Sequence, residues 1–261
     1  MQKSGQVFIL GFIRQTLLPE WDVTLLAVDA RMETGMKDAL ISYGISLVEI
    51  PPYCELQEPV AGHVDMQIIH ITGNILVCHP HLPDAVFKKL KKYGFDIYTG
   101  ETGLKRNYPL DIAYNVAIVG DTAFHNLKYT DRVIIELLSR FKFRLVHVNQ
   151  GYSKCSVLPV SGNAIITDDP SIGKAALKEG FEVLQIPPQT KILLPGFGYG
   201  FIGGAAGFIS RDVIAFAGNI DMLDSSDEIK DFLNKHNKKW VNLGYNGIHD
   251  YGSLIPLYEK S

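Results

Sequence analysis

The sequence has 261 residues, of which 46% are hydrophobic and 20% are charged, and its formal net charge is -3. This composition is ordinary for a globular protein, and the chain is long enough to bury a sizeable core. The small net charge and the lack of a basic run give no electrostatic reason to expect nucleic acid or an anionic membrane surface, so we predict neither as a partner.

The apolar segment Val7–Ile13 is far shorter than a membrane span, and no small-residue cleavage site follows it, so we interpret it as a strand. The three cysteines, Cys54, Cys78 and Cys155, are odd in number and widely spaced. That usage is typical of free thiols in a reducing compartment. We therefore predict a cytoplasmic protein.

A unit of two strands, a helix and a third strand begins at Gly62. Residues 62–71 and 75–78 have strand character about a hairpin-type turn. Apolar residues at helical spacing predict a helix that begins at Asp84 and ends before Gly94, after which residues 95–98 return as a strand. The unit is ββαβ.

The same order recurs along the chain, with expected helix starts at Thr130, at Asp169-Pro170 and at Ser225, where Glu228 would complete a capping box. We place the units at residues 62–100, 108–148, 151–187, 200–244, and, split across the termini, 247–258 with 22–51. The C-terminal strand would supply the first strand of the split unit and close the ring.

The period of roughly 40 to 50 residues is typical of propeller-like repeats. We therefore predict an α/β (α+β) fold in which residues 1–261 form a single domain, a five-bladed α/β propeller with pseudo-fivefold symmetry. The alternative is a non-symmetric α/β domain whose βα units look alike because short apolar strands resemble one another.

Cys155 follows the glycine-led loop that begins at Gln150 and opens an apolar strand that runs to Pro159. Thiol attack on an amidine-type carbon needs a nucleophile, a proton donor and a carboxylate, and Cys155, His63 and Asp65 have these chemistries. Lys154 would help to lower the thiol pKa, although its side chain would point to the opposite face of a regular strand. An inert buried thiol remains the alternative for Cys155.

Five ββαβ units with a cysteine at the mouth of one resemble the pentein fold of guanidino-group-modifying enzymes. This superfamily includes arginine and agmatine deiminases, dimethylarginine hydrolases, amidinotransferases and a non-enzymatic ribosome anti-association factor. His63-Val64-Asp65 is similar to its His-x-Asp motif, whose histidine is the general acid/base and whose aspartate contacts the substrate amidinium. The loop from Gly151 to Cys155, with Pro159, is similar to its nucleophile loop, and one unit separates the two motifs in both cases.

The chain departs from the deiminases in the fourth unit, where Phe201–Ala206 carries no carboxylate in place of their Glu-Gly-Gly-Asp stretch. Asp111 and the pair His249-Asp250 lie at the mouths of other units, and we predict that they contact the substrate instead. The aromatic residues Tyr152 and Phe201 are expected to line or seal the pocket.

Two other motifs do not support a cofactor or a metal. Gly198–Gly203 matches the dinucleotide-binding fingerprint. However, Pro195 interrupts the apolar segment that leads into these glycines, and a strand-like segment rather than a helix soon follows them. Close packing at a crowded axis explains these glycines better. Cys78-His79-Pro80-His81 lacks a recognised ligand spacing. We predict no cofactor and no metal.

The predicted function is that of a cysteine-dependent hydrolase or transferase, amidinohydrolase-like or amidinotransferase-like, acting on a small amidine- or guanidine-type C–N substrate through a covalent thiol intermediate. The partner is a small molecule, with a cationic group as one option. The alternative is a catalytically inactive pentein that binds a ligand or a protein. A third hypothesis is a nicotinamide-dependent enzyme, which requires a long helix directly after Gly203.

Overall fold

The structure is a computed structural model that describes residues 10–260. Its strands form several small sheets, and none of the sheets within this part of the chain closes on itself. The fold is therefore a mixed α/β arrangement of small sheets. None of the helices within residues 10–260 is long and apolar enough to span a lipid bilayer.

Four sheets have three strands each and share one topology: the first two strands pair antiparallel, and the third joins the second in parallel after a helix. Their elements are β4 (Ile68–Thr72), β5 (Ile75–Cys78), α3 (Asp84–Lys92) and β6 (Asp96–Thr99); β7 (Ala117–Val119), β8 (Thr122–His125), α4 (Arg132–Arg140) and β9 (Arg144–His147); β10 (Val157–Ser161), β11 (Ala164–Thr167), α6 (Pro170–Lys178) and β12 (Glu182–Gln185); β14 (Ala206–Ser210), β15 (Val213–Phe216), α7 (Ser226–Lys235) and β16 (Lys239–Asn242).

A fifth sheet joins the two ends of the described chain. In it, β18 (Ile255–Lys260) pairs antiparallel with β1 (Leu10–Phe12) and with β2 (Asp22–Asp29). After α1 (Thr34–Ser42), β3 (Ser46–Ile50) joins β2 in parallel. This is the pairing expected of the split unit. The strand predicted over Val7–Ile13 is found at Leu10–Phe12, and Val7–Ile9 lie outside the described residues.

Two strands that were predicted to begin at Gly62 and Cys155 begin later, and the prediction was wrong at both starts. One helical turn precedes each strand: α2 (Val64–Gln67) lies before β4, and α5 (Ser153–Ser156) lies before β10. The backbone N–H of Ile68 bonds to the carbonyl of Val64, as expected for a helical turn. Four residues are too few to display a helical period, so apolar content alone suggested strands.

The remaining short elements connect the sheets. The two-residue strands β13 (Ile192–Leu193) and β17 (Ile248–His249) pair in parallel, which was not predicted. Short 3-10 turns cover Glu58–Val60 and Ile220–Met222.

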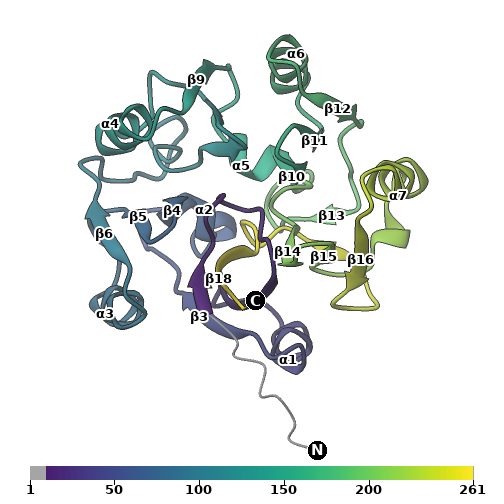
Figure 1. The fold of residues 1–261 in the computed structure, drawn as a ribbon, viewed down its shortest axis with the longest axis horizontal. Helices are drawn as coiled ribbons and strands as arrows, with labels where there is room; N and C mark the ends of the chain where they lie inside the picture. Colours follow the sequence, from purple (N-terminus) through teal and green to yellow (C-terminus); the bar gives the residue numbers. More distant parts are fainter. Residues whose placement is uncertain (1–9, 261) are drawn as a thin grey trace, which may run out of the picture.

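Hydrophobic packing joins each sheet to the next around the middle of the molecule. In Figure 1 the helices α1, α3, α4, α6 and α7 lie at the outside, while β10, β14 and β18 lie towards the middle. Each of five buried clusters contains residues from two neighbouring sheets, represented by Leu25 with Ile68, Ile69 with Ile118, Val119 with Ile165, Leu158 with Phe208, and Ala215 with Val28. The last pair connects the β14 sheet to the β2 sheet.

Helix starts agree with the sequence only in part. Asp169 caps α6 through hydrogen bonds from the backbone N–H groups of Ser171 and Ile172, with Pro170 in the first turn, as predicted. Ser225 precedes α7, but its side chain makes no capping bond. Instead its hydroxyl accepts a hydrogen bond from the Gln189 side chain at 3.2 Å, so the predicted capping box is wrong.

The helix α4 is capped by Asp131 and not by Thr130. The Thr130 hydroxyl bonds to His125 Nδ1 at 2.6 Å, which takes it away from the helix start. Asp131 is fully buried, and its Oδ1 accepts from the Val133 N–H at 2.9 Å. Its Oδ2 accepts from the backbone N–H groups of Glu101 and Thr102, at 2.8 and 2.7 Å. One carboxylate thus fixes both a helix start and a neighbouring loop.

We expect Asp131→Ala to lower the free energy of unfolding by about 2 kcal/mol, because three partly buried backbone N–H groups lose their acceptor. Urea denaturation of the variant and of wild type measures the difference. The exposed Asp121, replaced by Ala, is the matched control and should change stability less. A loss below about 0.5 kcal/mol for Asp131→Ala would contradict the capping role.

Candidate active site

Cys155 lies on the helical turn α5 and is buried, with 3% of its surface exposed. Its thiol donates a hydrogen bond to Asp65 Oδ2 at 3.1 Å, and Asn115 Nδ2 donates one to the sulfur at 3.2 Å. Asn115 Oδ1 also accepts from the backbone N–H groups of Lys154 and Cys155, at 2.8 and 3.3 Å. Asn115 therefore fixes the position of the Cys155 thiol. Sequence reasoning missed it, because no motif marks it.

His63 and Asp65 reach the same point from α2, where His63 immediately precedes the helical turn. The backbone N–H of Asp65 bonds to the carbonyl of Gly252 at 3.2 Å. Gly252 has a positive φ of 66°, and a Cβ at this position would lie 2.2 Å from His63 Cβ. The segment before β18 can approach α2 so closely only because residue 252 is glycine.

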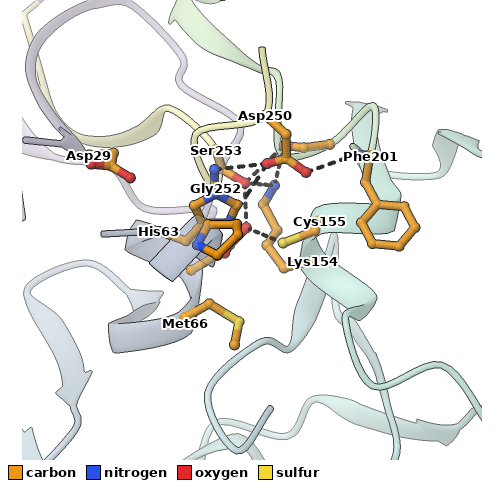
Figure 2. Close-up of polar contacts among 12 residues, drawn as sticks. Asp29, His63, Met66, Lys154, Cys155, Phe201, Asp250, Gly252 and Ser253 are labelled. Atoms are coloured by element: carbon orange, nitrogen blue, oxygen red, sulfur yellow. Dashed lines mark hydrogen bonds and ion pairs between the residues drawn. The ribbon is translucent and has the colours of Figure 1, made fainter. Parts of the chain in front are cut away.

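Asp250 completes the acidic side of the site. Its Oδ1 accepts from the Gly252 N–H and its Oδ2 from the Phe201 N–H, both at 2.9 Å. Asp250 Oδ1 also lies 3.8 Å from His63 Nδ1. Figure 2 shows His63 and Asp250 together near Cys155. Neither ring nitrogen of His63 has a hydrogen-bond partner among the described residues. The imidazole is therefore available for proton transfer.

Lys154 does not point away from the site, as a strand would require. Its ammonium is buried and donates hydrogen bonds to the carbonyl of Gly203 at 3.1 Å and to Ser253 Oγ at 2.8 Å. The Ser253 hydroxyl lies 2.8 Å from Asp65 Oδ2. The expectation was wrong because Lys154 and Cys155 lie on a helical turn, where consecutive side chains do not alternate between opposite faces.

A cavity of about 200 Å³ opens beside these groups. His63, Cys155 and Asp250 contribute polar atoms to it, and Tyr152 and Phe201 line it, as do Val60, Leu194, Phe197, Gly198 and Tyr199. Tyr152 and Phe201 thus line a cavity beside Cys155, and their contact with a substrate stays a prediction. Most of the remaining wall is apolar.

Asp65 does not line this cavity, but lines a separate space of about 10 Å³ together with Lys154. Two further predicted contact residues, Asp111 and His249, also lie outside the cavity lining. Asp111 Oδ2 accepts a hydrogen bond from the Tyr152 hydroxyl at 2.6 Å, so Asp111 supports a wall residue. His249 lines a neighbouring cavity of about 170 Å³, together with Arg31 and Tyr251. The roles of both residues towards a substrate stay predictions.

The glycines that resemble a dinucleotide fingerprint pack against this site. No helix follows Gly203, because the chain turns directly into β14. A Cβ on Gly203 would lie 2.2 Å from the carbonyl oxygen of Val157, and one on Gly204 would lie 2.0 Å from Asp250 Oδ1. Close approach of backbone and carboxylate explains these glycines, as predicted.

Burial dominates the electrostatics of the site. Burial and the carboxylates of Asp65 and Asp250 raise the pKa of the Cys155 thiol well above its ordinary value. Burial also raises the pKa of Asp250, although His63 opposes that shift. Burial lowers the pKa of Lys154, and Asp65 opposes this. Without a ligand, the nucleophile is therefore a protonated thiol.

His63, Asp65 and Cys155 also carry atoms of the kinds that ligate metal ions. One ligand-type atom each from His63, Asp65 and Cys155 lie within 4.8 Å of one another, which is close enough to surround an ion, and within residues 10–260 no other group does so. Two of these residues are hydrogen-bonded to each other, with the Cys155 thiol proton directed at Asp65, and the His63 imidazole lies beside them as part of the same acid–base group. We interpret them as that group, and the expected absence of a metal stays a prediction.

Asp168, which the sequence did not single out, follows β11 and is buried with no partner for its Oδ1. Burial, assisted by the carboxylates of Asp169 and Asp250, raises the pKa of Asp168 to about 7. The folded protein therefore holds this proton more tightly than the unfolded chain does. The contribution of Asp168 to stability falls as the pH rises through that pKa.

We expect Asp168→Asn to be more stable than wild type at pH 8, by roughly 2 to 4 kcal/mol, because the variant avoids burying a charge. Near pH 4 this advantage should disappear, since wild-type Asp168 is then protonated in the folded state. Denaturant unfolding at both pH values measures it. An equal difference in unfolding free energy between variant and wild type at pH 8 and at pH 4 would contradict the raised pKa of buried Asp168.

Comparison with known proteins adds a family and a fold. Residues 27–255 match the model of a family of unknown function, DUF6873. No curated protein sequence matches the chain. Among solved structures, DDAH from Pseudomonas aeruginosa, complexed with citrulline, is similar with a TM-score of 0.53 at 7% identity, over 92% of this chain and 100% of that one.

Two further solved structures have the same architecture. The inosamine-phosphate amidinotransferase of Streptomyces griseus gives a TM-score of 0.54 at 10% identity, over 95% of this chain and 96% of that one. The agmatine deiminase of C. jejuni gives a TM-score of 0.51 at 12% identity, over 94% of this chain and 93% of that one. At these identities the likeness concerns the fold. The chain therefore belongs to the DUF6873 family and has the pentein fold of the guanidino-group-modifying enzymes.

Proposed function

We propose that the protein is a cysteine-dependent hydrolase or transferase that acts on a small amidine- or guanidine-type C–N substrate through Cys155. One observation carries the proposal: the Cys155 sulfur, a His63 nitrogen and an Asp65 oxygen lie within 4.8 Å of one another. His63 and Cys155 line a cavity of about 200 Å³, large enough for a small molecule. The names of the structural neighbours, an amidinotransferase and a deiminase among them, support the same class.

Substrate charge activates the nucleophile in this proposal. Asp65 Oδ1 is buried and has no hydrogen-bond partner within residues 10–260, so we assign it as the acceptor for an amidinium N–H. A cation bound between Asp65 and Asp250 cancels the negative charge that raises the thiol pKa. The thiol therefore loses its proton to His63 more readily once the substrate is present.

The covalent steps then follow. The Cys155 sulfur forms a bond to the amidine carbon, and His63 returns the proton to the leaving nitrogen as the C–N bond breaks. Water next adds to the carbon of this S-amidino intermediate, giving one proton to His63. The S–C bond breaks as the new hydroxyl gives its proton to solvent and becomes the product carbonyl, and the thiolate recovers a proton from His63. In a transferase an acceptor amine replaces the water.

The outer residues shape the cavity for a compact substrate. Tyr152 and Phe201 form aromatic walls, with ring centroids 6.3 Å apart, beside Cys155. Asp111 holds the Tyr152 hydroxyl at 2.6 Å and thereby sets one wall. We assign His249, in the neighbouring cavity, to a more distant part of the substrate.

We also propose that residues 1–261 form one domain, a five-bladed α/β propeller with pseudo-fivefold symmetry. Support comes from the shared strand order of the sheets and from the clusters that link each sheet to the next, including the β14 sheet to the β2 sheet. The predicted cytoplasmic location remains a prediction.

The second candidate function is a catalytically inactive pentein that binds a ligand or a protein. A specific observation favours it: Cys155 is buried, protonated and hydrogen-bonded to Asp65, as an inert thiol would be. In addition, the segment from Phe201 to Ala206 has no carboxylate. The two candidates differ in whether a cationic electrophile reaches Cys155 and reacts.

We expect chloroacetamidine, a cationic amidine electrophile, to label Cys155 in preference to neutral iodoacetamide. The ratio of the two rates at Cys155 should exceed that at the exposed Cys54 by at least about tenfold, because Asp65 and Asp250 attract the cation. His63→Ala should slow the labelling of Cys155, since the proton acceptor is lost. Peptide mapping by mass spectrometry measures each rate.

Cys54 in the same molecule controls for reagent reactivity, and Cys155→Ser controls for peptide assignment. Equal ratios at Cys54 and Cys155, or labelling of Cys155 that does not depend on His63, would contradict the catalytic assignment and favour the binding function.

A further inference from the structure

The ammonium of Lys154 is an unexpected group in a site proposed for a cation. Lys154 is 4% exposed and directly precedes the nucleophile. Figure 2 shows its side chain running between Cys155 and the segment that carries Ser253 and Asp250. Burying an ammonium costs free energy unless an anion and hydrogen bonds compensate it. Its contacts therefore indicate what it is for.

The compensation comes through one bridging hydroxyl. Lys154 Nζ donates to Ser253 Oγ at 2.8 Å, and Ser253 Oγ lies 2.8 Å from Asp65 Oδ2. Gly203 O accepts a second bond from the ammonium at 3.1 Å. Ser253 Oγ thus lies between the Lys154 ammonium and Asp65 Oδ2, within 2.8 Å of each, and it also lies 2.8 Å from Gly203 O.

The contact with Ser253 leaves the two carboxylate oxygens of Asp65 in different environments. Oδ2 is occupied by Ser253 and by the Cys155 thiol, at 2.8 and 3.1 Å. Oδ1 is buried and has no hydrogen-bond partner in the described part of the chain. Asp65 can therefore offer a substrate one oxygen, and a fork-shaped contact with both oxygens would require the bridge to break.

The charged and titratable groups that face Cys155 are His63 and Asp65 from α2, Tyr152 and Lys154 beside it, and Asp250 from the segment before β18. Two carboxylates and one ammonium give a net charge of about -1 when His63, Tyr152 and the thiol are neutral. One positive charge on the substrate would balance this sum.

We propose that Lys154 is a positioning residue that acts through Ser253 and Asp65 as the internal counter-ion of the site, and thereby adapts it to substrates with a single amidinium charge. This inference rests on the proposed function and specifies its substrate class. It assigns a role to the lysine beside the nucleophile.

Two consequences follow from removing the ammonium. The site becomes more negative by one charge, so its preference for a cation over a neutral molecule rises. The Cys155 thiolate also loses its nearby positive charge, so the thiol pKa rises further and its reaction with a neutral reagent slows. A merely structural role would slow both reagents together and leave the pH profile unchanged.

The test compares wild type, Lys154→Met, and Lys88→Met on the exposed face of α3 as the matched control. Each protein reacts with chloroacetamidine and with iodoacetamide over a range of pH, and peptide mapping follows Cys155. In Lys154→Met we expect the ratio of amidine to neutral rate to rise about tenfold, and the neutral rate near pH 7 to fall about tenfold. Lys88→Met should match wild type. An unchanged ratio and pH profile in folded Lys154→Met would overturn the proposal.

Ser253→Ala provides a second variant in case Lys154→Met does not fold. Ser253 has a positive φ of 77°, and alanine carries the same backbone strain, so the substitution removes only the bridging hydroxyl. The ratio should rise in the same direction by at least about twofold, because the ammonium no longer reaches Asp65 through a hydrogen bond. An unchanged ratio here would also overturn the counter-ion role.

The proposed function and this inference can fail separately. If wild-type Cys155 shows no preference for the amidine, the proposed function fails, but the iodoacetamide pH profile of Lys154→Met still decides whether Lys154 acts on the thiol. If wild type prefers the amidine and Lys154→Met does not differ from it, only the counter-ion role fails.

Discussion

The hydrogen bond between the Cys155 thiol and Asp65 Oδ2 is the contact on which the rest of the site depends. It joins α5 to α2, which precede the first strands of two different sheets. Other site residues occupy the same kind of position: Asn115 precedes β7, Gly203 precedes β14 and Ser253 precedes β18. Because the first strands lie towards the middle of the fold, the residues before them converge there. The site is thus a product of the repeated topology.

Bringing these groups together buries several charges at once, and charge balance becomes the second constraint. Asp250 is held by two backbone N–H groups, and Asp65 by Ser253, which in turn accepts from Lys154. Gly204 permits the approach to Asp250, since a Cβ there would lie 2.0 Å from its Oδ1. In the proposed chemistry, the same low-dielectric surroundings that keep Cys155 protonated strengthen the effect of a bound cation on its thiol.

The sequence predicted the ββαβ order and the meeting of His63, Asp65 and Cys155, because turn residues, helix periods and two short motifs are local signals. It did not predict the helical turns α2 and α5, which are too short to show a period. The direction of Lys154 was therefore wrong as well. Asn115 and Ser253 carry no motif, and their roles depend on contacts with residues 40 and 188 positions away. Such contacts exist only once the sheets are assembled.

The most direct test of the central claim is to look for the covalent intermediate. Wild-type protein is incubated with a panel of small amidines and guanidines, quenched rapidly in acid during turnover and mapped by mass spectrometry. The proposed chemistry predicts that the Cys155 peptide gains the carbon-containing part of a substrate through a thioether, while Cys54 and the Cys155→Ser variant gain nothing. Unmodified Cys155 with every compound, in folded protein that binds at least one of them, would contradict the account and leave a ligand-binding pentein.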